Sequence, residues 1–357
     1  VNEGVIYDQS TNSQLSAWDT TNGVLFWARR GYSTSSTGAV YEGVVYAPFS
    51  NISGGFTNAQ LDGSLFAENV NLGSGTTLNA QQAPGFPAST YPLPLVAPTP
   101  VSPNTIYVSS TTGGTAGGVP FADEDVLIYN RETDTYTLTI DGSDIGLANA
   151  DIDAFALLTD GTILLSFDAS ISITGLGTVY DADIVKFTPT SLGSNTAGSF
   201  AWYFDGSDVG LTTSDEDIDA IGFTPDGKLV VSTLGSFSVS GVSGGDEDLI
   251  VFTATQLGVT TSGTWAMYFD GSDVSLNESS YEDVNGVWID EATGQVYLTT
   301  VGTFSVNTVA GDGADIFVCT PGSLGPNTLC TYGQGLYWDG SKNGFAGEVL
   351  DAFEVLK

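Results

Sequence analysis

The residues of this chain that could do chemistry are acids that return at a fixed interval. One set, whose members are equally spaced along the chain, comprises Asp153, Asp219, Asn285 and Asp351. A second set precedes a hydrophobic run in each repeat and comprises Asp125, Asp183, Asp248 and Asp315. A third set lies in Asp-Gly-Ser-Asp turns and comprises Asp205, Asp208, Asp270 and Asp273. Because Ca²⁺ binds carboxylate and carbonyl oxygens, these residues are the candidate ligands of a bound Ca²⁺.

The interval also indicates which elements hold these acids in place. The constant period from Asp153 to Asp351 predicts repeated supersecondary units that stack or close into a ring. In residues 217–274, alternating apolar residues and turn residues predict four strands, at 218–223, 228–233, 248–252 and 264–269. The same reasoning extends the second strand through 236–239 and places one helical turn at 253–258, ending at a glycine.

The first copy of the repeat is incomplete and the chain end completes it. Residues 105–109, 125–129 and 136–140 predict only three strands, and residues 349–355 supply the missing innermost one. Four strands per repeat and a ring closed by the last strand predict an all-β fold, a four-bladed β-propeller over 104–357. A row of β-sandwiches is the alternative, but it gives no reason for this permutation.

The direction of the side chains decides what the acids do. If the equally spaced set points into the channel of the ring, three carboxylates and one amide form a cation-binding ring. If the set points between the blades, its members are hydrogen-bonded structural residues, and sequence alternation leaves both readings open. The turn acids have a structural alternative too, because Asp side chains bond their own backbone in turns.

Charge and composition exclude several classes of function. The chain carries 42 acids against 7 bases, a formal charge of −35. Such a balance argues against nucleic acids and anionic lipids as partners, since both need clustered Lys and Arg. Bound cations would relieve the self-repulsion. The sequence has no histidine, which excludes histidine triads and histidine metal ligands.

The two cysteines and the hydropathy indicate the compartment. Cys319 and Cys330 lie close together in the last repeat, and we expect them to form a disulfide, typical of an oxidising compartment. The sequence lacks an apolar run long enough to span a bilayer, so no membrane insertion is expected. Val1 is consistent with a start left after removal of an export signal. We therefore expect a secreted or cell-surface protein.

The first hundred residues follow a different pattern. Strands on either side of Asn22-Gly23 predict a β-hairpin. Residues 43–54 echo residues 63–73 at an offset of 20, which predicts solenoid-like or sandwich-like strands. We expect a β-rich assembly or anchor region at 1–81 and a proline-rich linker at 82–103.

Two resemblances follow from these motifs. Residues 41–73, with Tyr-Glu-Gly-Val-Val-Tyr-Ala-Pro and Leu-Asp-Gly-Ser-Leu-Phe-Ala, resemble the choice-of-anchor A type domains of bacterial surface proteins. That resemblance implies export and surface display. Residues 104–357, with Asp-Gly-Ser-Asp-Val-Gly-Leu at 205–211, resemble β-propeller repeats of secreted bacterial proteins. Neither resemblance supplies catalytic residues.

The remaining motifs leave alternatives open. Trp202, Trp265 and Trp338 recur in the fourth strand, where they pack between blades or, alternatively, stack on sugars. Asn51 and Asn277 match the glycosylation pattern. A carboxylate pair could serve a carbohydrate-active enzyme, but pairs are inevitable among so many acids.

The sequence predicts a non-enzymatic extracellular structural protein. We expect its N-terminal region to self-associate into a homo-oligomer, fibre or surface array, with an acidic propeller stabilised by cations. A calcium-dependent glycan-binding adhesin is the alternative.

Overall fold

The computed structural model describes two parts of the chain. It describes residues 104–356, except Glu278 and Gln334, and the backbone of five strands within residues 14–80. The chain divides into two compact units, Val1–Ala97 and Pro98–Lys357. The predicted linker at 82–103 lies outside the described residues.

The N-terminal strands form one sheet in the order β1-β2-β3-β4-β5. Its strands are β1 (Gln14–Asp19), β2 (Val24–Gly31), β3 (Val40–Ser53), β4 (Gln60–Asn71) and β5 (Thr77–Ala80). The predicted hairpin is present, with Asp19 opposite Val24. The offset of 20 is the register of a parallel pair, because Val40 lies opposite Gln60 and Gly43 opposite Gly63.

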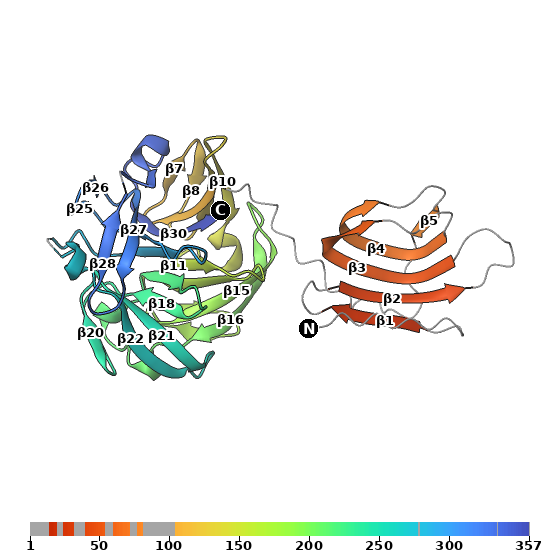
Figure 1. Cartoon of the computed structure of the whole chain (residues 1–357), viewed down its shortest axis with the longest axis horizontal. Helices are drawn as coiled ribbons and strands as arrows, with labels where there is room; N and C mark the ends of the chain where they lie inside the picture. The colour runs from red at the N-terminus through yellow and green to blue at the C-terminus, as the bar shows by residue number, and fades with distance from the viewer. Residues whose placement is uncertain are drawn as a thin grey trace. The chain divides into compact units, whose positions relative to one another are not determined.

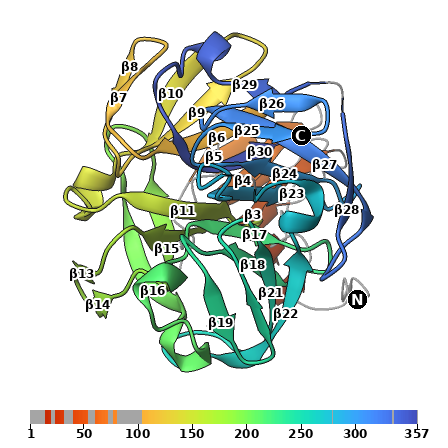
Figure 2. The same ribbon diagram turned by 90° about the vertical axis from the view of Figure 1, so that its left-hand side faces the viewer.

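Residues 104–356 form a four-bladed β-propeller, as predicted (Figures 1 and 2). Blade 1 contains β10 (Thr135–Ile140), β9 (Val126–Asn130), β6 (Thr105–Ser110) and β30 (Leu350–Leu356). Blade 2 contains β11 (Ile152–Leu157), β12 (Ile163–Phe167), β15 (Ile184–Ser191) and β16 (Ala197–Phe204). Blade 3 contains β17 (Ala220–Phe223), β18 (Leu229–Ser232), β21 (Leu249–Gln256) and β22 (Ser262–Phe269). Blade 4 contains β23 (Gly286–Ile289), β24 (Val296–Thr299), β27 (Asp315–Ser323) and β28 (Leu329–Tyr332), and β29 (Trp338–Asp339) also pairs with β27.

The C-terminal strand closes the ring. β30 runs antiparallel to β6, with Leu350 opposite Ser110 and Phe353 opposite Val108. The Asn104 N–H donates to the Leu356 carbonyl at 3.0 Å, which extends the pairing to the end of β30. Strands from the two ends of the described propeller therefore share one blade, which confirms the permuted closure.

The hydrophobic core lies between the blades rather than in one central mass. Four clusters of buried residues each join a pair of neighbouring blades. At the junction of blades 2 and 3, for example, Phe204 packs against Phe252 and Trp265, with ring centroids 5.3 and 6.0 Å apart. Each blade face is covered by its neighbour, so no blade can bury its apolar residues alone.

Two details of the repeat differ from the prediction. The segment 236–239 does not continue the second strand. Its residues Phe237–Val239 (β19) pair with Val242–Gly244 (β20) in a separate hairpin. Equivalent hairpins are β7 (Gly114–Ala116) with β8 (Val119–Phe121), β13 (Ile171–Ile173) with β14 (Gly177–Val179), and β25 (Phe304–Val306) with β26 (Val309–Gly311). The helical turn expected at 253–258 is wrong as well, because Thr253 and Ala254 stay in β21, opposite Thr264 and Gly263 of β22.

Short 3-10 turns follow the fourth strand of each blade. They are η1 (Gly142–Ile145), η2 (Ser207–Val209), η4 (Ser272–Val274) and η5 (Ser341–Asn343), while η3 (Ser214–Glu216) lies before β17. None of the helices in residues 104–356, where the structure describes them, has the length and apolarity that a membrane span requires.

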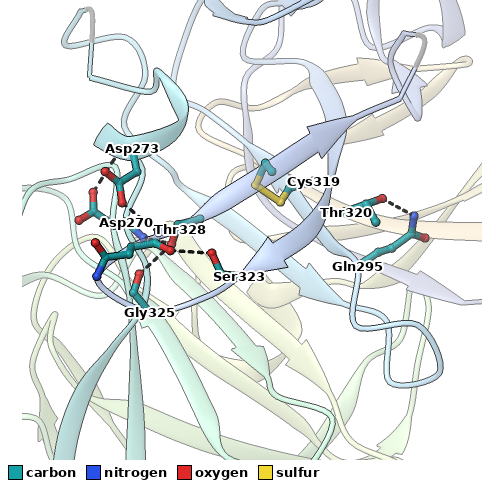
Figure 3. Close-up of a disulfide and its surroundings, with 10 residues drawn as sticks. Asp270, Asp273, Gln295, Cys319, Thr320, Ser323, Gly325 and Thr328 are labelled. Atoms are coloured by element: carbon teal, nitrogen blue, oxygen red, sulfur yellow. Dashed lines mark hydrogen bonds between the residues drawn. A yellow bond between two sulfur atoms is a disulfide. The ribbon is translucent and has the colours of Figure 1, made fainter.

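The predicted disulfide is present. Cys319 in β27 is bonded to Cys330 in β28, with the two Cα atoms 5.2 Å apart (Figure 3). The bridge joins the two outer strands of blade 4.

Candidate functional site

The acids that precede the third strands are held by the backbone. The carboxylate of Asp183 accepts the Tyr180 N–H at 2.8 Å and the Gly206 N–H at 3.0 Å, one on each oxygen. The same pair of bonds is made by Asp125, Asp248 and Asp315. Each acid thus ties the turn before the third strand to the Asp-Gly-Ser turn after the fourth. This gives the set a structural role, and metal binding by it stays a prediction.

The Asp-Gly-Ser-Asp turns connect each blade to the next. Asp273 accepts the Thr328 N–H at 2.9 Å, and the Thr328 hydroxyl accepts the Asp270 N–H at 2.9 Å (Figure 3). The same reciprocal pair joins Asp205 and Asp208 to Thr261, and Asp141 and Asp144 to Thr196. Sequence reasoning missed these threonines. Each lies in a Gly-x-x-Thr segment that begins at Gly193, Gly258 or Gly325, and that repeated motif could have identified them.

The junction of blade 4 with blade 1 uses other contacts. Lys342 replaces the last acid of the turn and forms an ion pair with Asp339 instead. The hydroxyls of Tyr129 and Tyr136 donate to the side-chain oxygen and the carbonyl of Asn343, at 2.8 and 2.7 Å. The short β9–β10 hairpin of blade 1 lacks a Gly-x-x-Thr loop, so the threonine that binds this acid in the other blades has no counterpart. The decay of the motif to Asp-Gly-Ser-Lys therefore has a structural reason.

The equally spaced set of Asp153, Asp219, Asn285 and Asp351 lies on or beside the innermost strands, around the propeller axis. β11, β17, β23 and β30 contact one another there (Figure 2). The residue just before each member of the set holds the innermost strand to the preceding blade through its backbone N–H. The donors are, in chain order, Ile152, Ile218, Val284 and Leu350, and the acceptors are the carbonyls of Asp123, Asp181, Asp246 and Gly313. A second acid lies two positions earlier in three of the four repeats. We call Asp151, Asp153, Asp217, Asp219, Asp283, Asn285 and Asp351 the axial cluster.

Several oxygens of the axial cluster are buried without a hydrogen-bond partner in the described residues. Asp219 is 1% exposed, and both of its carboxylate oxygens are of this kind. One side-chain oxygen is also buried without a partner in each of five other members, namely Asp151, Asp217, Asp283, Asn285 and Asp351. Asn285 also donates from Nδ2 to the Leu350 carbonyl at 2.5 Å, which is a contact between blades. Because buried polar atoms normally have partners, these oxygens are suited to a cation or to shared protons.

Burial and mutual repulsion raise the pKa of these carboxyls. Burial is the main cause of the shift of Asp217 to a pKa of about 9, with the charges of Asp153 and Asp181 adding to it. Burial and then Asp246 raise the pKa of Asp283 to about 8. The pKa values of Asp151 and Asp153 are both about 7, again mainly through burial. Burial also raises the pKa of Asp219 and Asp351 well above the usual range.

The repulsion couples carboxyls across the axis. Asp219 of blade 3 experiences the charges of Asp283 in blade 4 and Asp153 in blade 2. Asp351 of blade 1 experiences Asp151 and Asp153. The lysine–carboxylate pairs Asp226–Lys228 and Asp339–Lys342 lie on the surface and leave this charge uncompensated. In the described part of the propeller no three acidic side chains form a ready-made metal cage. A cation bound here would have to draw neighbouring carboxylates together.

The other candidate residues have structural surroundings. Trp265 is 8% exposed and donates from its ring to the Val209 carbonyl at 3.0 Å, and Trp338 is also buried. Trp202 is half-buried, so the three indoles contribute to packing rather than to an exposed sugar platform. Asn277 is exposed, while the side chain of Asn51 lies outside the described residues.

Comparisons with known proteins add little to this description. No protein-family model and no curated protein sequence matches the chain. Two crystal structures of the extracellular domain of BT4673 from B. thetaiotaomicron are similar to 60% of the chain at 12% identity, with TM-scores of 0.17 and 0.14. The chain spans about a third of their length, 33% and 34%. The four-bladed arrangement therefore rests on the strand pairing given above.

Proposed function

We propose that this chain is an extracytoplasmic, non-enzymatic structural protein. Its propeller is stabilised by a divalent cation bound at the axial cluster, and Ca²⁺ is the cation that we propose. The observation that carries the proposal is Asp219, whose two buried carboxylate oxygens have no neighbour in the described residues that could share a proton with them except the carboxyl of Asp283. A buried, uncompensated charge costs several kcal/mol, and a hard cation with oxygen ligands removes that cost. The disulfide supports a location outside the reducing cytoplasm.

The cation can be tested by calorimetry on chelator-treated protein at pH 8. We expect Ca²⁺ to bind with measurable heat and to raise the melting temperature by several degrees, since binding only to the folded state stabilises it. Asp219→Asn should weaken binding at least tenfold. Asp215→Asn is the matched control, because Asp215 is an exposed acid just before the same strand. Absence of binding to the wild type, or an equal loss in the control, would refute the site.

A second part of the proposed function is assembly through the N-terminal sheet. In this sheet β5 pairs only with Gln60–Gly63 at the start of β4, whereas β4 continues to Asn71. Among the strands described, the rest of that β4 edge has no neighbour. An open edge of this kind accepts another strand, and a second copy of the chain would extend the sheet. Such a head-to-tail contact builds a filament when it does not close. The resemblance of residues 41–73 to surface-display domains is consistent with this role.

Assembly can be tested by light scattering after size exclusion, together with electron microscopy. We expect the full chain to form oligomers or fibres as its concentration rises, because β1, the opposite edge strand of the sheet, can pair with the β4 edge of the next copy. The unit Pro98–Lys357 alone is the control and should stay monomeric. A full chain that remains monomeric at the highest soluble concentration would contradict the assembly role and leave the cation site untouched.

A further inference from the structure

The junction between blades 4 and 1 departs from the other three near the axis. At the other junctions the carbonyl that anchors the innermost strand belongs to Asp123, Asp181 or Asp246, and at this junction it belongs to Gly313. The position held by Asp151, Asp217 or Asp283 in the other repeats is occupied here by Val349. The fourth junction therefore loses two carboxylates and gains an apolar surface, because the side chain of Val349 packs against Gly313, where a Cβ would lie 2.9 Å from Val349 Cγ1.

A pocket lies at this junction, beside Val349. Its volume is about 360 Å³, and its walls include Tyr281, Val301, Thr303, Asp312, Glu348 and Val349. Tyr281 is 61% exposed at the rim. The position that Tyr281 occupies in the repeat is held by Asp215 in blade 3 and Asn149 before blade 2. The aromatic rim and the apolar wall thus occur together at one junction of the ring.

Two polar groups of the pocket, Asp312 and Glu348, are carboxylates held in place by hydrogen bonds. Asp312 accepts the Ala314 N–H at 3.1 Å. Glu348 accepts the hydroxyls of Ser110 and Thr112 on one oxygen, at 3.3 and 3.1 Å. Each carboxylate has a second oxygen, and Thr303 and Ser341 also line the pocket. Acceptors beside an aromatic ring and small apolar side chains match a ligand with hydroxyl donors and an apolar face.

We propose that this pocket binds a neutral saccharide. The ring of Tyr281 would cover the apolar face of one sugar residue, while Asp312 and Glu348 accept its hydroxyl groups. The volume is that of a small-molecule site. The formal charge of −35 disfavours phosphorylated, sulfated or uronic acid ligands. The pocket lies outside the axial cluster, so it extends the proposed function with a recognition role that does not require the cation.

Neutral oligosaccharides built from glucose, galactose, mannose or N-acetylglucosamine provide the test, first on an array and then by calorimetry with the full chain. We expect at least one to bind, and Tyr281→Ala to weaken it at least tenfold. Tyr180→Ala is the matched control, because Tyr180 is 58% exposed in another blade. Asp312→Asn should also weaken binding, while Asp219→Asn should leave it unchanged.

Three outcomes would overturn the saccharide site. The first is that no neutral sugar binds at millimolar concentration. The second is that Tyr180→Ala and Tyr281→Ala lose binding equally. The third is that a tetramethylammonium ion or a lysine-rich peptide occupies the pocket while sugars do not, since carboxylates beside an aromatic ring also suit a cation. Because Asp219→Asn is measured in parallel, failure of the saccharide site and failure of the axial cation site are distinguishable.

Discussion

Removal of residues 350–357 should prevent the propeller from folding, although the deleted segment is only the last strand of the chain. Leu350, Ala352, Phe353 and Val355 of β30 are each at most 2% exposed. Their loss would uncover the inner edge of β6 and the cores that blade 1 shares with blades 2 and 4. Phe353→Ala alone should cost about 3–5 kcal/mol, against a total stability of about 5–15 kcal/mol for a typical domain.

The measurement is circular dichroism and thermal unfolding of the truncated chain. A rearranged chain, in which residues 349–357 are moved to directly precede residue 104, is the control. Leu356 lies opposite Thr105 in the antiparallel pair, so a short turn can connect the two strands. We expect the rearranged protein to fold, because the same strand occupies the same place in blade 1. A truncated chain with native stability would show that β30 does not hold the ring closed.

The repeat made the fold predictable because the period of the sequence and the number of strands in each copy indicated the same architecture. The period set the number of blades, and the three strands of the first copy required a fourth from elsewhere, which residues 349–355 supplied. The errors fell where a local pattern had two solutions. Thr253 and Ala254 come shortly before a glycine, as a helix end would, but pairing with β22 keeps them extended. The β19–β20 hairpin was missed because its strands are very short, at Phe237–Val239 and Val242–Gly244.

The candidate site was predictable in position but not in environment. The spacing of Asp153, Asp219, Asn285 and Asp351 indicated equivalent places in the four blades, and the structure places them at the innermost strands. Which atoms are buried depends on side-chain direction, and alternation along a strand does not determine that for an axial position. The pocket at the fourth junction was not predicted, although Gly313, Val349 and Tyr281 break the repeat in the sequence. Departures from a repeat are therefore as informative as the repeat itself.

The cation-free propeller should lose stability as the pH rises from 5 to 8. The axial carboxyls have pKa values of about 7 to 9 in the folded protein, at Asp151, Asp153, Asp217 and Asp283. An unfolded Asp has a pKa of about 4. Between these values the folded state binds more protons than the unfolded state, so the free energy of unfolding falls with rising pH. For a buried carboxyl, a folded-state pKa one higher than the unfolded-state pKa lowers the free energy of unfolding by about 1.4 kcal/mol once the pH is above both values.

The opposite slope is expected in acid. Glu216 is buried, which raises its pKa, but N–H groups of Ser238, Thr212 and Thr213 outweigh burial and lower it. Its contribution is present above the unfolded pKa of a glutamate and is lost as the pH falls below about 4. The cation-free protein should therefore be most stable near pH 5, where Glu216 is ionised and the axial carboxyls are still protonated.

Thermal unfolding between pH 4 and 9, with chelator and with saturating Ca²⁺, measures both slopes. A loss of several kcal/mol between pH 5 and 8 would lower the melting temperature by about 2–4 °C per kcal/mol. Ca²⁺ should abolish most of that loss, because it replaces the protons that the axial carboxyls share. Asp219→Asn should flatten the slope without Ca²⁺, and Asp215→Asn should keep it. A cation-free protein equally stable at pH 5 and pH 8 would mean that the axial carboxyls ionise freely, and the cation site would lose its physical basis.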